Sequence, residues 1–238
     1  MNLFYAPTDQ IEGQYLELRA QEARHASKVL RYREGDAITV VDGEGGRYRG
    51  TIRNILNDTI RIEIETRERV EAPGPKRVLG MGIIKKRDRL EFAVEKAVEL
   101  GVAEIALFRG RHTVKENVRF DRLEATALSA MKQSLRAHLP DVCLFDSLAS
   151  LLEAYPGHER LIAHNPSQEE DIAETADRVA GRYTSADKLL LLVGPEGGFS
   201  QEEVELVLSD TYSGQVVSLG EHRLRTETAA VVFLSRFI

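Results

Sequence analysis

The chain of 238 residues is poor in several features that would define particular protein classes. Its single cysteine, Cys143, excludes an intramolecular disulfide and a cysteine-rich zinc site, and its apolar neighbours predict a core position. The six histidines have no ligand spacing, so we expect no metal. No apolar run is long enough to cross a bilayer, and residues 1–7 lack the regions of a secretory signal. The sequence therefore predicts a cytoplasmic globular protein.

Neither standard nucleotide fingerprint, G-x-x-x-x-G-K-[ST] or G-x-G-x-x-G, occurs after an apolar run. Instead, two apolar runs each lead into a loop marked by glycine. Residues 189–193 lead into 194–200, and residues 216–220 lead into 221–228. In open α/β sheets, ligands bind beyond the carboxyl ends of the strands. The two loops therefore predict a site built mostly from backbone.

Gly197 and Gly198 carry no side chains to block a ligand from the main chain, and both can adopt positive φ. We expect a Cβ at Gly197 to project into the ligand's space. Ser200 and Glu203 form a capping box that predicts a helix immediately after this loop. The alternative is a strand-to-helix turn that needs glycine for its geometry and binds nothing.

Charge is unevenly distributed along the chain, whose formal net charge is −6. Residues 76–140 carry a net charge of +6, whereas residues 141–238 carry −10. Residues 19–33 form a second basic cluster. Such clusters favour a polyanionic partner, although solvated surface charge is the alternative. We expect the acidic segment to face water or to bind a cationic small molecule.

Prolines and glycine at 73–76 predict a linker between domains 1–72 and 77–238. Before it, residues 37–41, 47–52 and 59–64 alternate like strands, and residues 42–46 predict a hairpin turn rather than a phosphate loop. Several short strands in so few residues favour a small β-barrel, a fold that often binds RNA.

After the linker, strands alternate with helices, which predicts an α/β domain with a mostly parallel sheet. The expected strands are 78–84, 103–108, 160–163, 189–193 and 216–220, and the expected helices include 90–100, 120–138 and one beginning at Thr226. Pattern alone favours an unknotted chain, since knots are rare.

The two glycine-marked loops also resemble a known family. L-V-G-P-E-G-G-F-S, followed by L-G-x-x-x-L-R-T-E-T-A, is similar to the C-terminal signature of bacterial small-subunit ribosomal RNA uracil-N3 methyltransferases, a branch of the SPOUT superfamily. The resemblance spans most of the chain. It includes residues 85–91, 96–102, 133–136 with Pro140, and His25, Val29, Leu30, Arg31, Gly35 and Asp36.

The resemblance implies a PUA-like β-barrel followed by an α/β methyltransferase domain with a trefoil knot. It implies a homodimer that acts on 16S ribosomal RNA or the assembled small subunit, with S-adenosylmethionine as cofactor. The expected cofactor-binding residues are His164, Asn165, Val193, Gly194, Pro195, Glu196, Gly197, Gly198, Leu219, Gly220, Leu224, Arg225 and Thr226.

Methylation of uracil N3 requires an unpaired base, removal of the N3 proton and alignment with the sulfonium methyl. Arg225, Glu227 and Arg136 are the candidate catalytic residues. A surface salt bridge at Arg225 and helix-end electrostatics at Glu227 are the alternatives. The candidate RNA-binding residues are Arg24, His25, Lys28, Arg31, Lys85, Arg87, Arg111, Gln133 and Arg136. His112 stands where the family usually has serine.

Two other functions stay open on the sequence. One is a related RNA methyltransferase that acts on a ribose 2′-hydroxyl or on transfer RNA. The other is an RNA-binding ribosome-assembly factor without catalysis, against which the intact loops count.

Overall fold

The computed structural model describes residues 2–72, 76–113, 117–164, 174–183 and 187–237. Contacts divide the chain into two compact units. The N-terminal unit comprises Met1–Ala72 and Leu128–Leu139, and the C-terminal unit comprises Pro73–Ala127 and Pro140–Ile238. The predicted domain boundaries place residues 128–139 in the second domain, whereas their contacts group them with the first.

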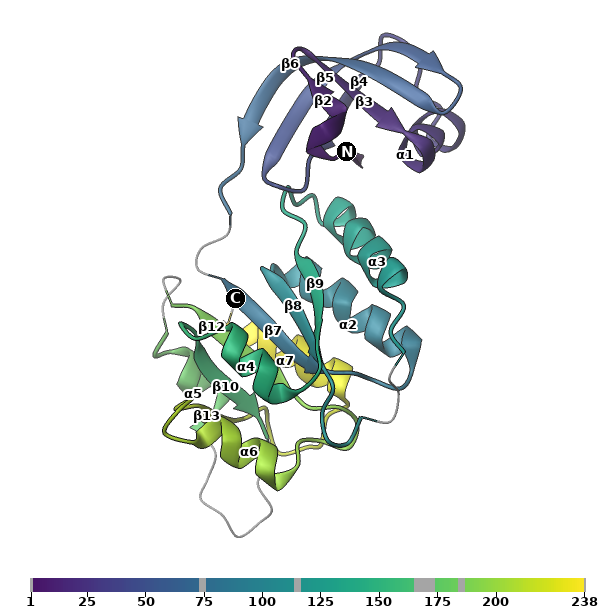
Figure 1. The fold of residues 1–238 in the computed structure, drawn as a ribbon. Helices are drawn as coiled ribbons and strands as arrows, with labels where there is room; N and C mark the ends of the chain where they lie inside the picture. The colour runs from purple at the N-terminus through teal and green to yellow at the C-terminus, as the bar shows by residue number, and fades with distance from the viewer. Residues whose placement is uncertain (1, 73–75, 114–116, 165–173, 184–186, 238) are drawn as a thin grey trace. The chain divides into compact units, whose positions relative to one another are not determined.

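A six-stranded sheet in the order β1-β4-β5-β6-β3-β2 forms the N-terminal unit (Figure 1). Its strands are β1 (Leu3–Tyr5), β2 (Ile11–Glu12), β3 (Tyr15–Arg19), β4 (Ala37–Val41), β5 (Gly46–Leu56) and β6 (Thr59–Arg69). The β1–β4 pair is parallel and the other pairs are antiparallel. Among the described residues, β1 and β2 are the two ends of this strand order, and the short strands that predicted a small β-barrel form one six-stranded sheet.

Alternation explains the central strands, because Ile52, Ile60 and Ile62 point into a buried cluster while neighbouring residues are more exposed. The predicted strands are confirmed, and β5 and β6 extend further than predicted. At Gly50 an added Cβ would lie 2.1 Å from the carbonyl oxygen of Glu63, so only glycine fits this bulged position.

The predicted hairpin turn between β4 and β5 is confirmed. The buried carboxylate of Asp42 accepts hydrogen bonds from the backbone N–H groups of Glu44 and Gly46, each at 2.8 Å, and from the Tyr48 hydroxyl at 2.9 Å. These bonds satisfy the turn internally, so it is not a phosphate loop.

Residues 134–139 pair with this turn, because the N–H of Leu139 donates to the carbonyl of Gly43 and that of Gly45 donates to Ala137. The preceding helix, α3, runs from Phe120 to Gln133 and ends before residue 138, the predicted end. Leu135 has a φ of +58°, which is incompatible with continuing a right-handed helix.

The C-terminal unit contains a parallel seven-stranded sheet in the order β11-β13-β10-β12-β7-β8-β9. Its strands are β7 (Arg77–Gly82), β8 (Glu104–Phe108), β9 (Asp141–Phe145), β10 (Glu159–Ala163), β11 (Glu174–Thr175), β12 (Leu189–Val193) and β13 (Gln215–Ser218). This confirms the predicted parallel α/β sheet. β9 and β11 were not predicted.

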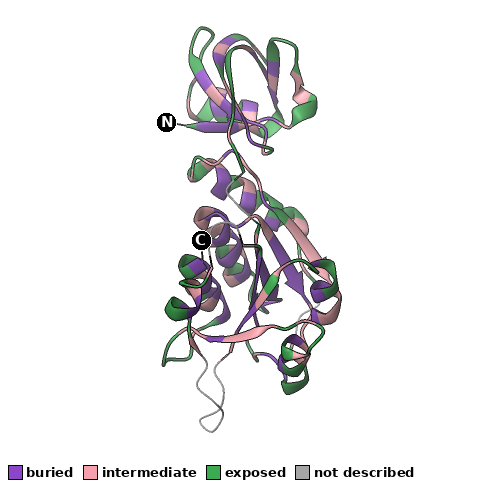
Figure 2. Cartoon of the chain, turned by 90° about the vertical axis from the view of Figure 1, so that its left-hand side faces the viewer, coloured by how far each residue is buried: buried purple, intermediate pink, exposed green. Residues whose placement is uncertain are grey.

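Helices cover both faces of the sheet. The helices are α2 (Arg87–Leu100), α4 (Leu148–Ala154), α5 (Ala176–Ala180), α6 (Gln201–Leu208) and α7 (Thr226–Phe237), besides α3. Figure 1 shows α4 and α6 over one face, and α2 and α7 together over the other. The run 189–193 is buried throughout because β12 lies centrally between these layers (Figure 2).

Local signals set the helix ends as predicted. Gly101, with a φ of 100°, ends α2, and Ser200 and Glu203 form the reciprocal capping box of α6. None of the helices in the described residues is long and apolar enough to span a membrane.

Cys143 lies half-buried in β9 and packs against the core cluster. Burial, together with the nearby Glu104 carboxylate, raises the pKa of its thiol to about 11. The thiol is therefore protonated near neutrality, as suits a packing residue.

Candidate functional site

A cavity of about 620 Å³ opens at the carboxyl ends of β10, β12 and β13 in the C-terminal unit. The loops after these three strands, the start of α7 and one residue of α2 line it. Strand order explains the convergence, because β13, β10 and β12 are parallel neighbours and their ends meet at one edge. This is the edge at which the sequence predicts a ligand site.

The structure brings most of the predicted cofactor residues together around this cavity. Those lining it are His164, Val193, Gly194, Pro195, Glu196, Gly197, Gly198, Leu219, Gly220, Leu224, Arg225 and Thr226. Asn165 lies outside the described residues. Lining residues that sequence reasoning missed are Arg89, Ala163, Phe199, His222, Arg223 and Ala229. Most of these adjoin predicted residues. Arg89 lies within the stretch 85–91 that carries the resemblance, but only Lys85 and Arg87 of that stretch were predicted to have a role.

Glycines open the cavity wall at two places. Gly198 and Gly220 have φ values of +76° and +132°, and an added Cβ would meet no heavy atom of the described residues within 4 Å. Gly197 differs from the prediction, because its φ is not positive and its Cβ would meet the Cβ of His112 at 2.7 Å. The missing side chain therefore leaves open space at Gly198, whereas at Gly197 the corresponding space is occupied by His112.

Close packing and hydrogen bonds hold the 194–200 loop in place. A Cβ at Gly82, the last residue of β7, would lie 2.5 Å from Cδ of Pro195. The backbone N–H of Lys85 donates to Glu196 Oε1 at 2.8 Å. The backbone N–H of Arg111 donates to Glu203 Oε1 at 2.9 Å, and this carboxylate also completes the cap of α6. The loop is therefore anchored by segments that precede it by about a hundred residues or more.

The charged lining of the cavity is mostly cationic. Arg89, Arg223 and Arg225 line it together with one carboxylate, that of Glu196. The acidic segment 141–238 supplies most of the lining but only one of its carboxylates faces the cavity, although that segment carries −10. Its acidic side chains lie largely elsewhere, and one arginine comes from outside the segment.

Glu227 lies in the first turn of α7 and is buried, with 7% of its surface exposed. Its Oε1 lies 3.4 Å from Nε of Arg89. Arg89 lines the cavity, whereas Glu227 is not among the lining residues. Of the predicted catalytic residues, Arg225 therefore faces the cavity directly and Glu227 lies behind an arginine.

Arg136 and Gln133 belong to the N-terminal unit. The residues that line the cavity all belong to the C-terminal unit. Gln133 is exposed and Arg136 is half-buried. Burial lowers the pKa of the Arg136 guanidinium from its usual value, although such a group stays charged at neutral pH.

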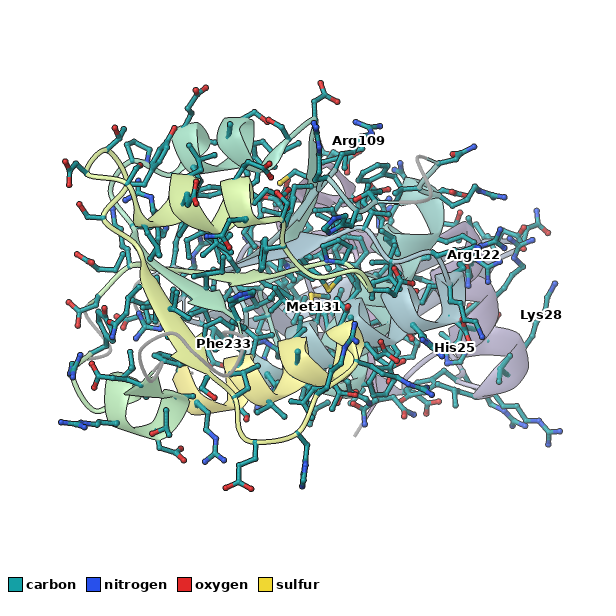
Figure 3. All side chains as sticks on the ribbon, turned by 90° about the horizontal axis from the view of Figure 1, so that it is seen from below. His25, Lys28, Arg109, Arg122, Met131 and Phe233 are labelled. Atoms are coloured by element: carbon teal, nitrogen blue, oxygen red, sulfur yellow. The ribbon has the colours of Figure 1, made fainter. Side chains whose placement is uncertain are left out.

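Arg24, His25, Lys28 and Arg31 are all exposed on α1 (Ala20–Arg24), the π-helical turn η2 (His25–Val29) and the residues after it. We call these four residues the η2 surface. Figure 3 shows the Lys28 side chain extending away from the ribbon. Val29 beside it is 63% exposed, which adds an apolar tip to a cationic surface. The remaining predicted RNA-binding residues, Lys85, Arg87 and Arg111, are exposed in the C-terminal unit.

Among the described residues, no group of three or more His, Cys, Asp or Glu side chains is placed to hold a metal ion.

Two family models match the chain. An RNA methyltransferase domain matches residues 72–238, and an RNA methyltransferase PUA domain matches residues 18–65. The first match covers more than half of the chain. The chain therefore belongs to this family of RNA methyltransferases, with a PUA domain before the catalytic one.

Full-length relatives agree with the family. The chain is 31% identical to the ribosomal RNA small subunit methyltransferase E of Mycobacterium bovis, over 98% of this chain and 89% of that protein. A probable rRNA-methyltransferase from Porphyromonas gingivalis has a similar structure, with a TM-score of 0.85, 32% identity and coverage of 98% and 95% of the two chains.

A ribosomal RNA small subunit methyltransferase E from Neisseria gonorrhoeae, solved bound to S-adenosyl methionine, also resembles this chain. Its TM-score is 0.79 at 26% identity, and the comparison covers 98% of this chain and 95% of that one.

Proposed function

We propose that this protein transfers a methyl group from S-adenosylmethionine to N3 of a uridine in 16S ribosomal RNA. The observation that carries the proposal is the cavity at the ends of β10, β12 and β13. It gathers the predicted loop residues in a chain whose relatives are ribosomal RNA small subunit methyltransferases. The relative from Neisseria gonorrhoeae, which was solved with this methyl donor, supports the choice of cofactor.

The cavity fits a molecule of the donor's size. Its volume of about 620 Å³ lies within the roughly 300–1,000 Å³ range of small-molecule sites. Open space at Gly198 and Gly220 lets a flat ring system approach the main chain closely. Backbone groups of the 194–198 and 219–224 loops would hold the adenine and ribose. When bound, S-adenosylmethionine would supply an electrophilic methyl group.

The residues of the chain have to orient uracil and favour loss of the N3 proton. A deprotonated uracil is anionic, and a cation near its carbonyl oxygens stabilises that form. Arg225, which lines the cavity and has an exposed side chain, is the residue we assign to this task. Arg136 remains a candidate for contact with the substrate from the N-terminal unit.

RNA would bind through side chains outside the cavity. The η2 surface offers four exposed basic or titratable groups, and only Arg24 has a carboxylate near its guanidinium in the described structure, Asp58 at 3.6 Å. Lys85, Arg87, Arg111 and Gln133 are exposed as well. Such groups neutralise phosphates without needing a preformed pocket.

We also propose that the C-terminal unit is knotted. β13 pairs with β10, yet α7, the next element, packs against α2, β7 and β12 beyond it. The chain therefore crosses back over strands laid down earlier, which is the arrangement that a threaded C-terminal segment needs. Stretching the unfolded chain from both ends tests this, because a retained knot shortens the extended length.

A homodimer that acts in the cytoplasm completes the proposal, on the strength of the family resemblance. Sedimentation of the free protein tests the oligomeric state. Mixing a variant that should be defective in RNA binding (Arg136→Glu) with one that should be defective in donor binding (Gly198→Val) tests whether the two subunits share a site. A shared site allows one intact site to form in the mixed dimer, so activity should recover.

Two measurements test the main proposal. Titration calorimetry with S-adenosylhomocysteine, the demethylated product, should show binding to the free protein. Mass spectrometry of 16S rRNA nucleosides from a deletion strain should show loss of one N3-methyluridine. Loss of a ribose methylation or of a transfer RNA modification would show that the substrate differs from the one proposed. Binding of S-adenosylhomocysteine without any lost modification would favour an assembly factor.

A further inference from the structure

Of the charged residues that line the cavity in the described structure, Arg89 comes from α2, while Arg223, Arg225 and Glu196 come from the loops. Its side chain is 24% exposed, whereas Arg223 and Arg225 are exposed residues. Arg89 therefore lies deeper in the wall than the loop arginines, where a bound small molecule rather than an RNA strand would reach it.

Glu227 restrains this arginine from behind. Its Oε1 faces Nε of Arg89 at 3.4 Å, and its side chain is 10% exposed. In the described part of the chain, no other partner of the Arg89 guanidinium is found, so its two terminal nitrogens carry no hydrogen bond. A guanidinium held through Nε presents its terminal N–H groups as a planar fork that suits a carboxylate.

We propose that Arg89 binds the α-carboxylate of the methyl donor's methionine moiety, and that Glu227 is a positioning residue that orients Arg89. This inference rests on the proposed function, since it assigns one polar end of that donor to one side chain of the cavity. It also removes Glu227 from direct chemistry, because a buried carboxylate behind an arginine does not reach the substrate's N3 proton.

The charge balance of the reaction favours the carboxylate over the target base as the partner of Arg89. Arg225 already supplies the cation that favours deprotonation of the base. Methyl transfer then neutralises that base, so a second, fixed cation beside it would stabilise the reactant more than the transition state. The donor's carboxylate keeps its charge from reactant to product. An arginine that binds it holds the donor without opposing the chemical step.

The fit of α7 supports the same assignment. Thr226 and Ala229, in the first turns of this helix of twelve residues, line the same cavity as Arg89 and Arg225. The positive end of the helix dipole adds to the arginine's field and favours an anionic group there.

Two ligands separate this role from a general effect on the fold. S-Adenosylhomocysteine carries the carboxylate, and 5′-methylthioadenosine has the same nucleoside but lacks the amino-acid part. For Arg89→Met we expect affinity for the first to fall by about tenfold to a hundredfold, as expected when a charge-assisted hydrogen-bonded pair is removed. Affinity for the second should stay within about twofold of wild type.

Arg122→Met is the matched control. Arg122 also pairs through Nε with a carboxylate, Glu91 at 3.1 Å, but it does not line the cavity. The Arg122→Met variant should bind S-adenosylhomocysteine and methylthioadenosine as tightly as the wild-type protein does. Glu227→Gln, which keeps the shape of the side chain, should lower the affinity for S-adenosylhomocysteine by about threefold to tenfold and spare methylthioadenosine. Thermal unfolding identifies any variant that is not folded.

Equal loss of both ligands in a folded Arg89→Met protein would overturn the assignment, as would full retention of both with a reduced rate of methyl transfer. These results differ from failure of the proposed function, in which the wild-type protein binds neither ligand. Arg89→Lys provides a further check, because it keeps the charge but loses the fork and should recover only part of the affinity.

Discussion

Under the proposed function, the cavity and the η2 surface would hold their ligands by opposite means. The cavity is formed by loops at the ends of three parallel strands, and at two of its glycines, Gly198 and Gly220, the missing Cβ leaves open space in the described structure. The η2 surface consists of exposed side chains on a short helical segment of the N-terminal unit. A single added side chain should therefore block ligand binding in the cavity, whereas RNA binding at the η2 surface should weaken gradually as charges are removed.

The two regions also differ in how composition relates to charge. At the η2 surface, neighbouring basic residues in the sequence remain neighbours on the surface. Around the cavity, a segment of net charge −10 contributes mostly arginines to the charged lining. The local field that a ligand meets is set by the few side chains facing it, and the total over a segment does not determine it.

The largest effect should come from Gly198→Val. Its φ of +76° and the open space around its missing Cβ place the new side chain beside the 194–198 backbone. We expect binding of S-adenosylhomocysteine to become undetectable by calorimetry, with a stability loss of about 1–2 kcal/mol from the left-handed backbone.

Gly35→Val is the matched control for this substitution. Gly35 has a φ of +91° with nothing within 4 Å among the described residues, and it belongs to the N-terminal unit. It should show the same backbone cost and normal donor binding. If both variants bind the donor equally well, the glycine loop does not form the binding wall.

A smaller effect is expected for Arg225→Gln. If Arg225 stabilises the deprotonated base, kcat should fall by about 10²- to 10³-fold, while donor affinity changes little. Single-turnover kinetics with saturating donor and RNA would measure this. An unchanged kcat with weaker RNA binding would instead make Arg225 part of the RNA-binding surface.

Reversing charge at the η2 surface should reduce RNA affinity by about tenfold to a hundredfold when Arg24→Glu, Lys28→Glu and Arg31→Glu are combined. The salt dependence should flatten by roughly 0.7 to 1 in the log–log slope for each phosphate that the variant no longer neutralises. Filter binding over a salt series measures both quantities.

Donor affinity in the triple variant should match wild type. A double reversal at Lys76 and Lys188, two lysines of the C-terminal unit that do not line the cavity, controls for total charge. If the control weakens RNA binding as strongly per charge, the η2 surface has no special role.

The smallest effect concerns Gly197. Because its added Cβ would meet the His112 Cβ at 2.7 Å, Gly197→Ala should displace the neighbouring loop and lower donor affinity a few-fold. His112→Gly in the same protein removes the opposing atom and should restore the affinity, which calorimetry can follow. Failure of this rescue would mean that the new methyl group meets the ligand directly.

Local chemistry was readable from the sequence because its partners are close along the chain. The capping box of Ser200 and Glu203, the end of α2 at Gly101 and the Asp42 turn each depend on residues within about five positions. Likewise, the run 189–193 and the glycines after it predicted a strand and a ligand loop. These features define the parallel α/β class and most of the lining of the cavity.

Features that depend on distant partners could not be predicted in this way. Helix α3 stops at Gln133 because residues 134–139 bond to a turn almost a hundred residues earlier. No periodicity records that pairing. The two-residue β11 is too short to leave a pattern in the sequence. The prediction missed β9 although its apolar run 142–145 lies between Pro140 and Asp146, so the signal for this strand was present.

The sequence by itself determined where the strands and loops of the site lie and which family the chain belongs to, because both depend on short patterns of residues. Only the tertiary structure decided which side chains face the cavity. Arg89 and Glu227 are far apart in the chain, yet Nε of Arg89, which lines the cavity, lies 3.4 Å from Oε1 of Glu227. Likewise, His112 is distant from Gly197 in the chain, yet its Cβ occupies the space that a side chain at Gly197 would need. Side chains from separate elements meet only when the sheet and its helices have packed, so the charge and shape of the cavity follow from long-range contacts.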